Sequence, residues 1–462
     1  MARKDLEALT KEELIDLILK QAEQLAKLQA DYEALKQKFE QNQKKPPTTS
    51  KNSSQPPSRD QKGNQPKGRR KWRHGPPLGH EKHERKFVAQ TDEVVHVAPQ
   101  NCCKCHADLS AETGRLVKVD QITELPEAKA QVIEVRQYEV ICPDCQQAQV
   151  QAPPIGLEMQ RAFGARLEAT VVYYRQEQHM SYARTQKALL DLFGVAISQG
   201  GIDEIMKRAG KRALQKVAAL QVAVQGSAVI HCDDTSSRVD GDNWWEWVFC
   251  SVHTALHVIR FNRSVDVIQD VMGQSQAAVW VSDCWGPQLK APARERQLCL
   301  AHQLRNLQAV VDENPRLFWL QAIQALFRTA IHLHHQRSQL PPKRFSAEIA
   351  RIERLCDWLL QRSPSPPKAQ KLQRRYQKYR HSLFVFLYRT DVEPTNNVAE
   401  RALRPSVIHR KVAGGFRSDW GAKTYAALAS VIDTAELSGI RAFDAIQSLF
   451  GPPALPIPAG GE

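Results

Sequence analysis

Five short strand-like runs lie close together in a sequence whose other regular segments have helical patterns, and this feature limits the fold most. The runs are Ser227–His231, Trp244–Val252, Ala255–Phe261, Ala277–Val281 and Gln297–Leu300. Trp245, Trp247 and Phe249 occupy alternate positions of the second run, which is the period of a strand. Strands flanked by long helical segments predict an α/β domain built around a sheet.

Two carboxylates directly follow strand-like runs, and a third lies on a later helix. Asp233 comes just past the first run, in the letters CDDT, and Asp283 just past the fourth, in SDCW. Glu400 shares one face of a later helix with Asn396 and Asn397. A single Asp after a strand is usually a turn residue or a helix cap. Carboxylates on the first strand, the fourth strand and a late helix match a ribonuclease-H-like core with a helical insertion.

Phosphodiester displacement explains why carboxylates would gather in such a core. Two Mg²⁺ ions about 3.5–4 Å apart can activate the attacking oxygen and stabilise the leaving oxygen. Hard cations of this kind take oxygen ligands. The sequence therefore predicts a catalytic site for two Mg²⁺ ions at Asp233, Asp283 and Glu400.

The positive charge is concentrated in one low-complexity segment. The chain has 462 residues and a net charge of +14, and residues 41–86 hold 13 Lys and Arg against 3 Asp and Glu, which is +10. This Pro-, Gly-, Ser- and Gln-rich segment cannot bury enough apolar surface to fold alone, so it is either a plain solvated linker or a linker that also lies along phosphates. The predicted phosphate contacts surround Trp72 and are Lys67, Arg69, Arg70, Lys71 and Arg73. No apolar run reaches the roughly 18 residues of a membrane-spanning helix, which favours nucleic acid over a membrane as the partner.

Residues 5–40 have the pattern of one long helix. Apolar residues from Leu14 to Phe39 recur alternately four and three apart, with Gln21 as the polar exception. Such a seam, flanked by charged residues, predicts a coiled coil that makes the protein a homo-oligomer. The alternative is a helix that packs on the chain's own body.

Two CxxC pairs, Cys102-x-x-Cys105 and Cys142-x-x-Cys145, predict one structural Zn²⁺ ion held by four thiolates. A strand-like run, Val132 to Ile141, lies in the 36-residue interval between the pairs. Cys103 and His106 are spare donors that could substitute as ligands. The alternative is a coincidence among the ten cysteines of the chain.

Residues 160–215 have the pattern of a helix-turn-helix. A turn at Phe193-Gly194-Val195 separates two helices, and Ser198 is a candidate N-cap for the second. That helix is expected to end in a cationic stretch that includes the predicted DNA contacts Lys207 and Arg208. The alternative is a plain pair of packed helices.

The chain resembles transposases of the bacterial insertion sequence 66 family over nearly its whole length. The matching texts are NSSQPPS, GPPLGH, the two CxxC pairs, AFGARLEATVVYYRQEQHMSYARTQKALLDLFGV, HCDDTSSRVDG, WWEWVF, VSDCWG, CLAHQLRNL, TNNVAERALRPSVIHRK and GAKTYAALASVIDTAELSG. The chain departs from the family in having Asp234 where Glu is usual, and Cys284 and Trp285 where Gly and Tyr are usual. Cys299 and His302 match a family Cys-x-x-His text, and they form either a second metal site or a packed pair.

This resemblance implies a DDE transposase, with Asp233, Asp283 and Glu400 as the triad. It implies cleavage at the element's 3′ ends and strand transfer into target DNA, with Arg401 and Arg404 contacting phosphates near the scissile bond. The implied partners are the terminal inverted repeats, the target DNA and accessory proteins of the same element. The alternatives are a ribonuclease-H-like nuclease without strand transfer, and a DNA-binding regulator with an inert core.

The first residues, MARKDLEALTKEELIDL, are too charged for a signal peptide, so export is not expected. The resemblance implies the bacterial cytoplasm, at the nucleoid, as the location. The expected segments are a coiled coil (1–42), a basic disordered linker (43–90), a zinc module (91–155), a helix-turn-helix-like region (156–222), a catalytic core (223–301 and 391–450), a helical insertion (302–390) and a disordered tail (451–462).

Overall fold

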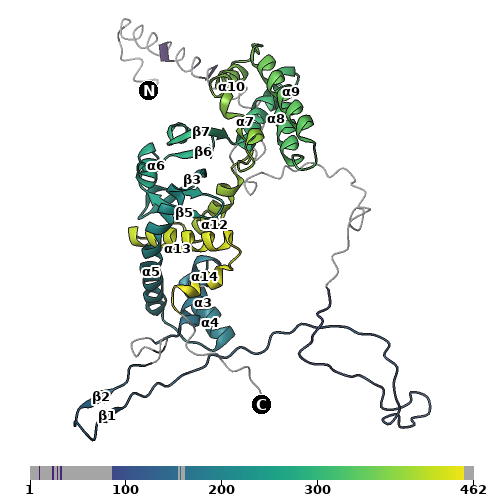
Figure 1. Ribbon diagram of the computed structural model, residues 1–462, viewed down its shortest axis with the longest axis vertical. Helices are drawn as coiled ribbons and strands as arrows, with labels where there is room; N and C mark the ends of the chain where they lie inside the picture. Colours follow the sequence, from purple (N-terminus) through teal and green to yellow (C-terminus); the bar gives the residue numbers. More distant parts are fainter. Residues whose placement is uncertain are drawn as a thin grey trace.

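The computed structural model describes residues 86–153, 157 and 162–451, together with the isolated positions 10, 23, 24, 29, 32, 33 and 52 (Figure 1). Positions 23, 24, 29, 32 and 33 are helical. The rest of the predicted coiled coil, most of the basic linker and nearly all of the predicted tail lie outside the described residues. In the described part of the chain, no helix is long and apolar enough to cross a membrane.

A five-stranded mixed sheet forms the middle of the molecule, as the sequence predicts. Its strands are β3 (Val229–Val239), β4 (Asp242–Cys250), β5 (Ala255–Arg260), β6 (Ala277–Ser282) and β7 (Ala293–Leu298). Their order across the sheet is β5-β4-β3-β6-β7. The first three strands pair antiparallel, and β6 and β7 run parallel to β3.

The first strand is longer than the sequence predicts, and this corrects the expected place of Asp233. β3 does not end at His231 but continues to Val239, because every residue from His231 onward pairs with β4. Asp233 therefore lies within a strand rather than just past its end. The polar run after Ile230 looked like a turn, yet antiparallel pairing satisfies its backbone groups. The last strand also begins earlier than predicted, at Ala293 rather than Gln297.

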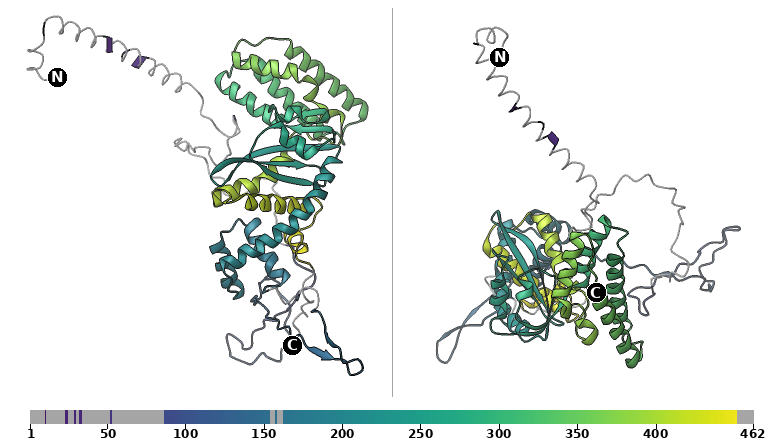
Figure 2. Two further views of the ribbon diagram at one scale, coloured as in Figure 1. Left: turned by 90° about the vertical axis from the view of Figure 1, so that its left-hand side faces the viewer. Right: turned by 90° about the horizontal axis from the view of Figure 1, so that it is seen from above.

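Helices cover both faces of the sheet (Figure 2). On one face, Cys232, Trp247 and Trp280 pack against α6 (Val265–Met272) and the end of α5 (Gln199–Gln225). On the other face, α12 (Asn397–Ala413) packs on β4, and α13 (Asp419–Leu437) packs on the far ends of β3 and β5. Because neighbouring strand residues point to opposite faces, Asp233 and Asp234 face different layers.

Residues 302–390 are largely helical, as predicted, and they form a bundle above the sheet in Figure 1. The bundle contains α7 (Leu300–Glu313), α8 (Phe318–His335), α9 (Pro342–Leu360), α10 (Pro367–Lys378) and α11 (Val385–Tyr388). Two short 3-10 helices are η2 (Gln288–Lys290) and η3 (Arg380–Ser382). The apolar core of the bundle is continuous with Val279 and Val281 of β6, so the bundle is anchored beside Asp283.

A second group of helices consists of α3 (Ala165–Gln176), α4 (Tyr182–Phe193), α5 (Gln199–Gln225) and α14 (Ala442–Ser448). The predicted turn is present: Gly194 has a φ of 65°, and the side chain of Ser198 accepts a hydrogen bond from the N–H of Gly201 at 3.0 Å. The second helix does not end at Arg212 as expected. It continues to Gln225 because its later apolar residues reach the core beneath the sheet.

The region of the Cys pairs contains one short hairpin, β1 (Glu139–Ile141) and β2 (Ala148–Val150). The predicted strand from Val132 to Ile141 is therefore too long, since only its last three residues pair with another strand.

Candidate active site

Sheet register brings the two aspartates side by side. β3 and β6 are parallel neighbours with His231 opposite Val281. Two residues further along each strand stand Asp233 and Asp283, the latter directly after the end of β6. Residues at equal register on adjacent parallel strands point to the same face. Both carboxylates are thus presented at one edge of the parallel part of the sheet.

Glu400 completes the carboxylate group from the first turn of α12. Burial raises the pKa of Asp233 to about 8, and the negative charges of Asp283, Asp234 and Glu400 contribute to that rise. The carboxylates therefore act on one another electrostatically. The oxygens of Asp233, Asp283 and Glu400 do not all lie within 4.8 Å of one another in the described structure.

Asn396 attaches the start of α12 to the sheet. Its side-chain Nδ2 donates to the carbonyl of Cys232 at 2.9 Å, and its Oδ1 lies 3.2 Å from Nδ1 of His231. Its backbone N–H donates to Sγ of Cys299 at 3.1 Å. Asparagine before a helix usually caps the helix with its side chain, but this buried side chain binds the sheet instead. Sequence reasoning placed Asn396 near Glu400 and missed this role.

The junction of β7 and α7 ties the remaining parts of the site together. The N–H of Cys299 donates to the carbonyl of Ser282, the residue before Asp283, at 2.8 Å. The N–H of Leu300 donates to the carbonyl of Pro394 at 2.9 Å, in the loop that leads into α12. These bonds connect the elements that carry the second and third carboxylates.

Cys299, His302 and Glu400 could hold a metal ion, since their ligand atoms lie within 4.8 Å of one another. Burial raises the pKa of the Cys299 thiol to about 11, so the sulfur is protonated at neutral pH. Burial lowers the pKa of His302, as does the positive charge of Arg305, while the charges of Glu400 and Asp283 oppose this. Without an ion, this cluster is a packed thiol and a neutral imidazole beside the third carboxylate.

Glu400 is paired with a cation from α7. Nη2 of Arg305 donates to Oε1 of Glu400 at 3.0 Å, and Nδ1 of His302 lies 3.5 Å from the same oxygen. Sequence reasoning missed Arg305, because 95 residues separate it from Glu400. A second glutamate close to Glu400 in the sequence, Glu393, lies in the loop before α12, with its carboxylate 3.7 Å from Nε2 of His334.

A second cation braces the opposite face of the sheet. Arg263 binds the carboxylate of Asp234 through Nε at 2.7 Å and Nη2 at 3.3 Å. The guanidinium lies over the rings of Trp285 and Trp245, at 3.9 and 4.6 Å from their centroids. The N–H of Trp285 in turn donates to Oδ1 of Asp283 at 2.9 Å. Sequence reasoning also missed these contacts, because the residues that make them are far apart in the chain.

The predicted cations of α12 remain at the surface. Arg401 and Arg404 are both exposed, one and four residues after Glu400. Of the two, Arg404 lies one helical turn beyond Glu400, on the same side of α12.

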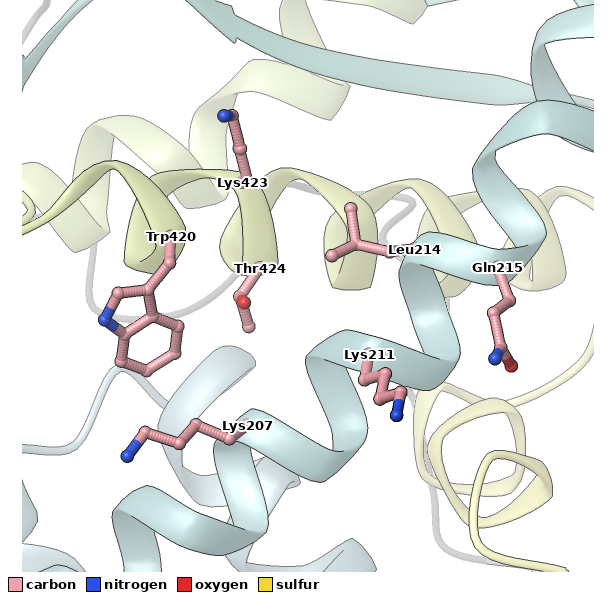
Figure 3. Close-up of a pocket in the computed structure, with 7 residues that line it drawn as sticks. All are labelled: Lys207, Lys211, Leu214, Gln215, Trp420, Lys423 and Thr424. Carbon is pink, nitrogen blue, oxygen red and sulfur yellow. The ribbon is translucent and has the colours of Figure 1, made fainter.

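The predicted cations of α5 are both engaged by acids of the chain. Lys207 pairs with Asp203 and Glu204, and Arg208 pairs with the buried carboxylate of Glu168. A groove of about 590 Å³ lies between α5 and α13 (Figure 3). Its lining residues are Lys207, Lys211, Leu214, Gln215, Trp420, Lys423 and Thr424. None of the three carboxylates lines this groove, so it is separate from the acidic site.

The two Cys pairs form the same turn. The N–H of Cys102 donates to the carbonyl five residues later, and its carbonyl accepts from the N–H four residues later, both at 2.9 Å. Cys142 repeats both bonds at the same distances. The residue four positions after each of these cysteines, His106 or Gln146, has a φ of 58°. Sequence spacing alone did not reveal this repeated geometry.

Backbone N–H groups point at the first sulfur of each pair. They lower the pKa of Cys102, with the N–H of Cys105 acting most strongly, and the N–H of Cys145 does the same for Cys142. Across the described residues, these four sulfurs are not brought into one group of metal ligands.

The predicted linker contacts, Lys67, Arg69, Arg70, Lys71 and Arg73, lie outside the part of the chain that the structure describes.

Comparison with protein families shows which family the chain belongs to. A model described as the Transposase IS66 family matches residues 160–424, more than half of the chain. The chain belongs to the Transposase IS66 family. The match to this family contains Asp233, Asp283 and Glu400 and extends from before α3 into α13. A search of curated proteins gave no match. Membership of the IS66 family supports a transposase role.

Proposed function

We propose that the chain is a DNA transposase with a ribonuclease-H-like core, which cleaves the 3′ ends of its element and joins them to target DNA. The observation that carries this proposal is that Asp233 on β3 lies within electrostatic reach of Asp283 and Glu400, and that all three fall within the family match. The strand order β5-β4-β3-β6-β7, with three antiparallel and then two parallel strands, supports the same core.

The carboxylate group fits divalent cations. A buried aspartate beside three further carboxylates, with its pKa raised to about 8, is a site where bound positive charge relieves repulsion. Its oxygen ligands suit Mg²⁺. Asp233, Asp283 and Glu400 would together hold two such ions. Bound there, the ions would activate the attacking oxygen and stabilise the leaving oxygen.

Arg401 and Arg404 are proposed to hold DNA phosphates next to the carboxylates. Both are exposed on the helix that carries Glu400, and an arginine can bind two phosphate oxygens at once. Attachment of α12 through Asn396 and of Asp283 through Cys299 would keep the reacting groups in register. A reaction of this type tolerates little displacement of its ligands.

Recognition of the terminal repeats is proposed for the modules before the sheet. The identical turns at Cys102 and Cys142, with N–H groups aimed at the sulfurs, support thiolate binding of Zn²⁺, and one ion held jointly with Cys105 and Cys145 would require the two turns to come together. Lys207 and Arg208 of the helix-turn-helix-like region would contact DNA only in competition with their present acidic partners. The basic linker would follow phosphates through Lys67, Arg69, Arg70, Lys71 and Arg73.

The wider setting is also a proposal. Residues 5–40 would pair subunits so that two element ends are held together, accessory proteins of the same element would assist, and the reaction would take place at the bacterial nucleoid. The alternatives are a nuclease of the same fold without strand transfer and an inert DNA-binding regulator.

One assay separates these functions. Purified protein is incubated with Mg²⁺, a labelled duplex carrying the element's end and a target plasmid. A transposase gives both a cleaved end and a joined product, whereas a nuclease gives cleavage alone. A gel shift without either product would indicate a binding protein and would contradict the proposal.

A further inference from the structure

Arg305 stands inside the candidate active site rather than on a remote surface. Its Nη2 lies 3.0 Å from Oε1 of Glu400, and the two side chains are only 28% and 22% exposed. Arg305 belongs to the second turn of α7, and the start of this helix is hydrogen-bonded to Ser282, which precedes Asp283, and to Pro394, in the loop before the helix of Glu400. The helix that carries Arg305 is therefore held by the same bonds that connect the elements of two of the carboxylates.

The chemistry of this pair differs from that of an ordinary surface ion pair. Glu400 is proposed to bind a cation, and a guanidinium that neutralises the same carboxylate competes with that cation. The guanidinium has five N–H donors in a planar fork, and its bond to Glu400 uses one of them. This fork matches the oxygens of a phosphate. The substrate of a transposase brings a phosphate to these carboxylates.

We propose that Arg305 is a further catalytic residue, which holds Glu400 before divalent cations bind and donates to a non-bridging oxygen of the scissile phosphate when DNA is bound. This inference rests on the proposed transposase function. Arg305 exchanges one anionic partner for another, so no unpaired charge is left in the partly buried site. Arg401 and Arg404 differ from it because they are exposed and belong to the helix of Glu400 itself.

This exchange of anionic partners predicts that Arg305→Gln binds divalent cations more tightly but cleaves DNA more slowly. Without DNA, the variant should bind Mn²⁺ about two- to five-fold more tightly than the wild type, because partly exposed ion pairs contribute up to about 1 kcal/mol. Under single-turnover conditions with saturating Mn²⁺, cleavage of a labelled element end should slow by about 10²- to 10³-fold, the usual effect of losing one donor to a developing negative charge. Arg305→Lys should recover part of the rate, since it keeps the charge but not the fork.

The controls distinguish this role from a structural one. Arg328→Gln changes an exposed arginine of the neighbouring helix α8 and should alter neither measurement. Thermal unfolding of the variants reports on folding. Weaker or unchanged Mn²⁺ binding by Arg305→Gln, or normal cleavage, would overturn the proposal for Arg305. If Glu400→Gln binds Mn²⁺ as tightly as the wild type, the proposed metal site itself fails, and the role of Arg305 fails with it.

Discussion

The side-chain amide of Asn396 donates a hydrogen bond to the carbonyl of Cys232 at 2.9 Å, joining the residue before α12 to the residue before Asp233. Oδ1 of the same asparagine also lies 3.2 Å from Nδ1 of His231, and its backbone N–H donates a hydrogen bond to the sulfur of Cys299. One buried side chain thus fixes the helix of the third carboxylate against the strand of the first. The positions of the carboxylates depend on this contact between segments 164 residues apart.

Asn396→Ala should lower both stability and cleavage. The substitution leaves the buried carbonyl of Cys232 without this partner, and a lost buried hydrogen bond costs about 1–3 kcal/mol. Urea unfolding should reveal that loss, and cleavage of a labelled element end should slow even where the variant is fully folded. Asn397→Ala is the matched control, because Asn397 is exposed at the next position, and it should change neither quantity. Equal effects of the two variants would contradict the role of Asn396.

A buried histidine should make stability depend on pH. Burial lowers the pKa of His257, but hydrogen bonds to Asp433 at 2.9 Å and Glu246 at 3.0 Å outweigh burial and raise the pKa to about 10. An unfolded histidine has a pKa of about 6.5. The stabilisation is therefore fully present below about pH 6.5 and is lost as the pH rises toward 10.

The measurement for this histidine is urea unfolding of the wild type and His257→Gln between pH 6.5 and 9.5. The variant should be less stable by about 3–5 kcal/mol at the lower pH, because it breaks a buried ion pair, and the difference should shrink as the pH rises. His253→Gln, which changes an exposed histidine nearby, should follow the wild type. A difference that grows with pH would mean that His257 is neutral in the folded protein.

Zinc analysis tests the repeated turns of the Cys pairs. The full-length protein should contain about one Zn²⁺ per chain, and Cys142→Ser should lose it, because a tetrahedral site needs all four ligands. Cys103→Ser is the matched control and should retain the metal, since Cys103 lies between the ligands of the first pair. Full zinc content in Cys142→Ser, or loss in Cys103→Ser, would require a different set of ligands.

Local patterns predicted much of the fold and the positions of two candidate carboxylates on their elements. Asp283 was placed correctly because an apolar strand ends just before it, and Glu400 because Asn396 and Asn397 mark the start of its helix. The extent of β3 was not predictable from its own residues, since pairing with β4 makes its polar half a strand.

The contacts that orient the site escaped prediction for the same physical reason. Arg305 contacts Glu400, and Arg263 contacts Asp234, because the fold brings distant segments together. No local pattern in the sequence predicts such contacts. Asn396 was visible as a helix-start residue, yet its side chain turns to the sheet because a buried carbonyl is available there. Tertiary packing decides such partners, and local residue preferences do not.

The most direct test of the carboxylate assignment compares Glu400→Gln with Glu393→Gln in Mg²⁺-dependent cleavage of a labelled element end. Glu400 lies on a helix fixed to the sheet, whereas Glu393 lies in a loop with its side chain 54% exposed. Glu400→Gln should abolish cleavage and joining while a gel shift shows normal DNA binding, and Glu393→Gln should cleave within a few-fold of the wild type. Near-normal cleavage by Glu400→Gln together with an inactive Glu393→Gln would contradict the assignment.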